Sequence, residues 1–93
     1  MSGTGLRSPR HFIVEHRCDL VERISLVEPL VDILRQEDVL NQGEYETIRA
    51  GETRAEQARR LLDAVIHKGR KAMDVLQEAL WQQDPYLMKE LHR

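Results

Sequence analysis

The most regular pattern of apolar positions in the chain lies between residues 53 and 69. Ala58, Leu61, Leu62 and Val65 recur at spacings of three and four residues, which places them on one side of an α-helix. The polar and charged residues between them fall on the other side. This segment is therefore predicted to be a helix that buries one face and exposes the other.

Both ends of this helix carry local signals. Thr53 and Glu56 have the spacing of a capping box, in which a hydroxyl and a carboxylate each satisfy a backbone N–H group at the helix start. Gly69 is suited to the turn that ends the helix. The outward positions carry three arginines: Arg54, Arg59 and Arg60.

The same helical spacing predicts five further helices. They cover about residues 10–26, 27–36, 41–49, 71–82 and 85–92. No run of residues alternates between polar and β-branched or aromatic side chains, so no strand is predicted. Because the connections are only a few residues long, the helices are expected to form an all-α, compact antiparallel bundle of six helices.

The first predicted helix has one irregularity. Arg17 falls within the apolar stripe formed by Ile13, Leu20 and Ile24. Either Arg17 extends its charged end to solvent over a buried stem, or the helix bends nearby and turns the side chain outward. We favour the bend.

Three other helix starts are predicted from local chemistry. Pro29 suits the first turn of a helix, where a backbone N–H is not required, and is preferred as the first helical residue of its segment. Asn41 is the expected cap of the short third helix. Asp84 followed by Pro85 is the expected start of the last helix.

The apolar stripes together define a predicted core. Its members are Ile13, Leu20, Ile24, Leu30, Ile33, Leu34, Leu40, Ile48, Leu61, Leu62, Val65, Met73, Leu76, Leu80 and Leu87. Tyr86 is also expected to face inward, and Cys18 is expected to be a buried or half-buried structural cysteine.

Composition limits the class of protein. The 93 residues suffice for one domain, with residues 1–9 predicted to be a flexible linker and residues 10–93 the domain. The net charge of −2, from 14 basic and 16 acidic residues, argues against a generic nucleic-acid binder.

The single cysteine excludes an intramolecular disulfide and favours the cytoplasm. The apolar runs are too short for a transmembrane helix or a signal peptide.

The sequence contains no pattern that predicts catalysis. The four histidines are scattered and form no recognised metal-ligand motif, so no metal is expected. The glycines do not form a phosphate-binding loop, and no cofactor is expected. Cys18 and His16 lie within one helix and not in a predicted cleft, so they are not expected to form a catalytic pair. The protein is therefore predicted not to be an enzyme.

Charged residues of opposite sign gather on different helices. Acidic residues crowd the segments 27–36 and 41–49 and the turn between them, whereas arginines gather on the segments 10–26 and 53–69. One explanation is that these are solvated faces, with pairs such as Arg59 and Asp63 formed along one helix. The other is head-to-tail association of copies through complementary charge.

The chain resembles the caspase recruitment domain (CARD) of the death-fold superfamily over about residues 10–92. The resemblance rests on the order and spacing of six segments: EHRCDLVERI at 15–24, VEPLVDIL at 27–34, VL at 39–40, YETIR at 45–49, QARRLLD at 57–63 and PYLMKEL at 85–91. The stretch HFIVEHR at 11–17 and the closing segment at 85–91 are most similar to the CARDs of inflammasome adaptors and sensors.

This resemblance implies a Greek-key bundle of six helices in which the first helix is bent or broken. It also implies homotypic binding, in which a basic surface of one domain meets an acidic surface of another, and helical filaments that recruit a caspase. The implied partners are a caspase prodomain, or an adaptor or sensor CARD, in inflammasome or apoptotic signalling. The implied basic surface is Arg17 and Arg59 with the adjacent Arg54 and Arg60. The implied acidic surface is Asp32, Glu37, Glu44 and Glu46.

Two alternatives remain open at this point. The chain could be a CARD-only decoy that caps the filament of a partner. It could also be a helical nucleic-acid-binding domain, which the net charge disfavours.

Overall fold

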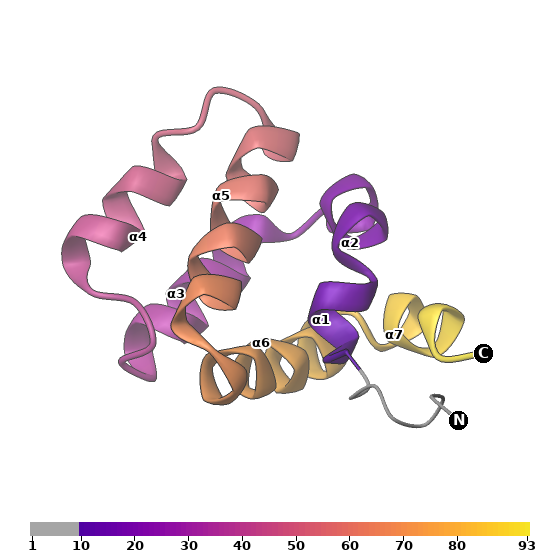
Figure 1. Ribbon diagram of the computed structural model, residues 1–93. Coiled ribbons are helices and arrows are strands. Elements are labelled where there is room, and N and C mark those ends of the chain that lie inside the picture. The colour runs from indigo at the N-terminus through magenta and orange to yellow at the C-terminus, as the bar shows by residue number, and fades with distance from the viewer. Residues whose placement is uncertain (1–9) are drawn as a thin grey trace.

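The computed structural model describes residues 10–93, which form seven helical segments and no strand (Figure 1). The segments are α1 (Phe12–Glu15), α2 (Arg17–Arg23), α3 (Val27–Gln36), α4 (Gln42–Arg49), α5 (Arg54–Lys68), α6 (Arg70–Gln83) and α7 (Pro85–Leu91). Because α1 and α2 are the two halves of the predicted first helix, the expected bundle of six helices with a broken first helix is confirmed. The predicted linker, residues 1–9, lies outside the described residues.

The break between α1 and α2 lies at His16. This residue has φ −106° and ψ 23°, and its N–H still donates to the carbonyl of Phe12 at 3.0 Å. Ile13 and Leu20 are fully buried on either side of the break, whereas the side chain of Arg17 is 35% exposed. The break therefore lets both apolar residues enter the core while the charged side chain stays at the surface.

The predicted helix starts are found in the structure, except for one bond of the capping box at α5 and the position of Pro29 in α3. The Asn41 side chain accepts from the Glu44 N–H at 2.8 Å, and the Glu44 carboxylate accepts from the Asn41 N–H at 2.9 Å. At the start of α5, the Thr53 hydroxyl accepts from the Glu56 N–H at 3.0 Å, but the Glu56 carboxylate bonds to the N–H of Glu52 at 3.4 Å. The capping box of α4 is thus complete, and that of α5 lacks its reciprocal bond.

Pro29 is the third residue of α3 and not, as predicted, the first. The prediction was wrong because each of the first few backbone N–H groups of a helix lacks an intrahelical partner, so proline is tolerated throughout that turn. At the other end of the chain, Asp84 caps α7 as expected and accepts from the N–H of Leu87 at 3.2 Å.

The core lies between α3, α5 and α6, which pack against one another. In Figure 1, α5 lies between α2 and α4, and it contacts both helices. All but one of the predicted core residues are buried. The exception is Ile33, which is only partly buried against the edge of the core because it lines a groove between α3 and α6.

Two predicted inward positions were wrong. Tyr86 is 72% exposed, because Leu87 and Met88 form the buried face of α7. Cys18 is exposed on α2 and is not a structural core cysteine. Among residues 10–93, no helix is long and apolar enough to cross a membrane.

Candidate interaction surface

The predicted basic residues lie on two helices that pack together. Arg17 begins α2, and Arg54, Arg59 and Arg60 lie on α5. We call these four arginines the basic surface. These two helices pack against each other although they are far apart in sequence, and the four arginine side chains differ in what they contact.

Arg17 is held by a carboxylate of α5. Its Nε and Nη2 donate to Oδ1 of Asp63 at 3.0 and 2.7 Å. The sequence suggested Arg59 as a helical partner for Asp63, but Asp63 instead contacts a residue 46 positions earlier. Arg59 is exposed, and within residues 10–93 its side chain makes no hydrogen bond or ion pair.

The other two arginines bind backbone carbonyls. Arg54 donates from Nη1 to the carbonyls of Val21 and Ile24 at 2.8 and 2.7 Å, at the C-terminal end of α2. Arg60 donates to the carbonyl of Thr47 at 2.7 Å and to the Glu56 carboxylate at 2.7 Å. Both side chains therefore join α5 to a neighbouring helix, whereas within residues 10–93 the side chain of Arg59 joins nothing.

Of the predicted acidic residues, Asp32 lies on α3 and Glu37 directly follows that helix. Glu44 and Glu46 lie on α4. We call Asp32, Glu37, Glu44 and Glu46 the acidic surface. They do not form one continuous cluster. Asp32 and Glu44 contact residues of neighbouring elements, Glu46 pairs within α4, and Glu37 lies at a groove on the other side of α3.

Asp32 belongs to a polar chain that joins α3 and α4. It accepts from the Tyr45 hydroxyl at 2.7 Å, which in turn accepts from Arg49 at 3.2 Å. Arg49 also pairs with Glu28 at 2.6 Å. The hydrogen bond to Asp32 raises the pKa of the Tyr45 hydroxyl, so the tyrosine stays protonated and donates to the carboxylate.

Glu44 serves both its own helix and the end of α5. Besides the capping bond, it forms an ion pair with Lys68 at 2.9 Å. The backbone hydrogen bond from Asn41, and after it the hydrogen bond from Lys68, lowers the pKa of the Glu44 carboxyl. Glu46, in contrast, is exposed, and among the described residues its carboxylate accepts only from the Gln42 amide, at 2.9 Å.

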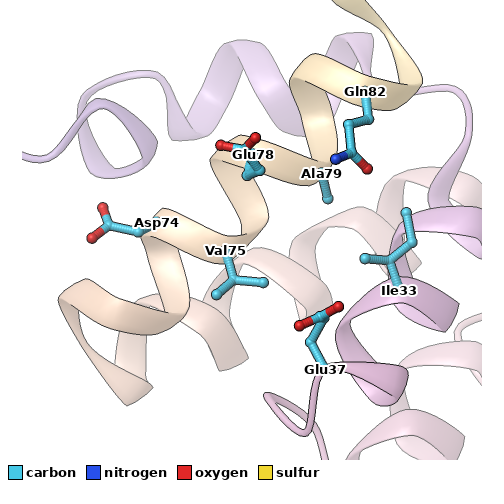
Figure 2. A pocket seen from close by; sticks show the side chains of 7 residues that line it. All are labelled: Ile33, Glu37, Asp74, Val75, Glu78, Ala79 and Gln82. Atoms are coloured by element: carbon cyan, nitrogen blue, oxygen red, sulfur yellow. The ribbon is translucent and has the colours of Figure 1, made fainter.

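Glu37 lies in a groove of about 300 Å³ between α3 and α6 (Figure 2). One side of the groove is formed by Ile33 of α3 and by Glu37 at the end of that helix. Across from them lie Val75 and Ala79 of α6. Within residues 10–93 the Glu37 carboxylate makes no ion pair or hydrogen bond. Its surroundings therefore differ from those of the other three acidic residues.

Sequence reasoning missed Arg49 and Glu28, which hold α3 against α4. The two are 21 positions apart, so no local spacing indicates their contact. No local spacing indicates the bond from Tyr45 to Asp32 either, since Asp32 lies 13 positions earlier. Within residues 10–93, no three His, Cys, Asp or Glu side chains are grouped so that they could hold a metal ion.

The family model described as the caspase recruitment domain matches residues 10–93, the whole of the described range. The chain therefore belongs to the caspase recruitment domain family.

Several curated relatives are similar to this chain. The apoptosis-associated speck-like protein containing a CARD of Danio rerio is 40% identical over 82 residues, which cover 87% of this chain and 40% of the relative. The NACHT, LRR and PYD domains-containing protein 1b allele 3 of Mus musculus is 36% identical over 81 residues, covering 87% of this chain and 7% of that protein. The chain thus spans less than half the length of these relatives.

One solved structure, described only as an unknown protein, matches with a TM-score of 0.84 and 32% sequence identity. The match covers 87% of this chain and 93% of the other. It supports the assignment of the fold.

Proposed function

We propose that this domain is a non-catalytic module that binds other CARDs through its basic and acidic surfaces. The observation that carries the proposal is the position of Arg59. It is an exposed arginine with no side-chain partner in residues 10–93, and it lies on α5, which packs against the helix that carries Arg17. A carboxylate on another CARD would satisfy both its charge and its donors.

The two surfaces come from different helices, so the contact is head to tail. The basic surface of one copy meets the acidic surface of the next, and each bound copy still offers one unused surface. Such heterologous contacts produce rings if the rotation closes and open helical filaments if it does not. We infer that filament growth of this kind nucleates the recruitment of a caspase or adaptor.

The names of the relatives indicate the kind of signalling in which this domain would act. One is an apoptosis-associated speck-like protein containing a CARD, and the other contains NACHT, LRR and PYD domains. We therefore propose that the domain acts in cytoplasmic inflammasome or apoptotic signalling.

Charge reversal tests the proposal. Arg59→Glu and Asp32→Arg should each abolish self-assembly, as seen by sedimentation and negative-stain microscopy, because each places like charges at the contact. Mixing the two variants should restore a one-to-one complex, since the unaltered surfaces can still pair. Lys89→Glu, on the exposed side of α7 and outside both surfaces, is the matched control and should assemble normally.

Circular dichroism should show that both variants remain helical. Normal filaments from Arg59→Glu and Asp32→Arg would refute the charge assignment. A wild-type domain that stays monomeric but shortens the filaments of another CARD would instead be a decoy.

A further inference from the structure

The carboxylate of Asp63 lies within the basic surface, one helical turn after Arg59. Its Oδ1 accepts from both Nε and Nη2 of Arg17. The side chain of Asp63 is 57% exposed and that of Arg17 35% exposed. The pair is therefore accessible to water and to a partner.

This contact occupies donors that a partner would use. A guanidinium carries five N–H donors in one plane, and two of those of Arg17 are directed at Asp63. A partner carboxylate that approaches Arg17 on this side must displace Asp63 or share the guanidinium with it. Because exposed ion pairs are weak, the exchange can take place, but it subtracts from the binding free energy.

We propose that Asp63 is an internal competitor that weakens the binding of the basic surface to the acidic surface of a partner CARD. The proposal rests on the proposed function above, since it assigns a regulatory residue to the same surface. Arg59 makes the first contact in this scheme, and Arg17 joins when the partner carboxylate replaces Asp63. Only a partner with enough negative charge to engage both arginines then binds tightly.

An asymmetric pair of variants allows this to be measured without filament growth. One copy carries Arg59→Glu and presents only its acidic surface. The other carries Asp32→Arg and presents only its basic surface. Their dissociation constant is measured by calorimetry, with and without Asp63→Asn in the second copy.

Removing the charge of Asp63 should tighten the complex about two- to fivefold at low ionic strength, the range expected for an exposed ion pair. The gain should shrink as salt increases, because screening weakens the competing contact. The gain should also disappear when the second copy carries Arg17→Gln, because Asp63 then has no guanidinium to hold. Glu78→Gln removes the same charge from α6, outside the basic surface, and should leave the affinity unchanged.

Each other outcome counts against the proposal. Weaker or unchanged binding of Asp63→Asn would show that Asp63 does not compete. An equal gain in the Arg17→Gln background, or with Glu78→Gln, would show a general charge effect. Failure of the two parent variants to bind would overturn the proposed function itself, and the competitor with it.

Discussion

Truncation of Leu62 should lower the stability of the domain without changing the charged residues proposed to bind a partner. It is fully buried on α5, the helix that also carries Arg59. The helix packs against α1, α2, α3, α4 and α6, and Leu62 belongs to the buried core cluster, so the space left by a smaller side chain is enclosed by the bundle. Leu62→Ala should therefore destabilise the fold without altering a charged surface.

The expected loss can be worked from the burial. Leu→Ala removes three carbon groups, at about 0.8 kcal/mol each when buried, which is about 2.4 kcal/mol. A cavity that the neighbouring helices cannot close adds to this, so the expected range is about 2–5 kcal/mol. The matched control is Leu26→Ala, because Leu26 is 45% exposed and its truncation should cost only about 1.3 kcal/mol, roughly half the transfer term of a fully buried leucine.

Urea unfolding followed by circular dichroism gives both values. The measurement is best made in the Arg59→Glu background, so that assembly does not contribute to the apparent stability. The unfolding slope should stay constant, which shows that the free energy of unfolding has changed and not the unfolded state. A loss for Leu62→Ala no larger than that for Leu26→Ala would refute the reasoning from burial.

Two further predictions concern the cap of α4. Asn41→Ala should lower the free energy of unfolding by about 1 kcal/mol, because the N–H of Glu44 loses its acceptor; an unchanged urea midpoint would show that the cap contributes nothing. Glu44→Gln should remove part of the pH dependence of stability, since the folded state lowers the pKa of this carboxyl. The ionised group stabilises the fold above its unfolded pKa, and that contribution is lost as the pH falls through the folded pKa. Urea midpoints of the two proteins should therefore differ at neutral pH and converge as the pH falls below the ordinary pKa of a glutamate, about 4.3, and through the lower pKa of the folded state; a difference that stays constant over this fall would contradict the prediction.

The helices themselves follow from local sequence. The stripe of Ala58, Leu61, Leu62 and Val65 and the caps at Asn41 and Thr53 depend on residues within one or two turns of each other. Such short-range relations can be read from the chain without a fold, because helical spacing alone brings the residues together. The irregular place of Arg17 in its stripe also predicted a bend.

Burial at the edges of the bundle could not be read in the same way. Ile33 lies in the apolar stripe of α3, yet the groove facing α6 leaves it partly exposed. Tyr86 lies beside the buried residues of α7 but points to solvent. Periodicity tells which side of a helix is apolar, whereas the packing of neighbouring helices decides how much of that side is covered.

Helical spacing and local charge were enough to predict a helical bundle with arginines on one pair of helices and carboxylates on another. Which of those charges find a partner within the domain depends on how the helices pack. The contact of Arg17 with Asp63 and the carbonyl contacts of Arg54 and Arg60 join residues that are 13 to 46 positions apart. Such pairs form because the packed helices bring the groups within hydrogen-bond distance, and no spacing along the chain encodes that distance. Arg59 consequently differs from its neighbours in the fold, although in the sequence it is one arginine among several.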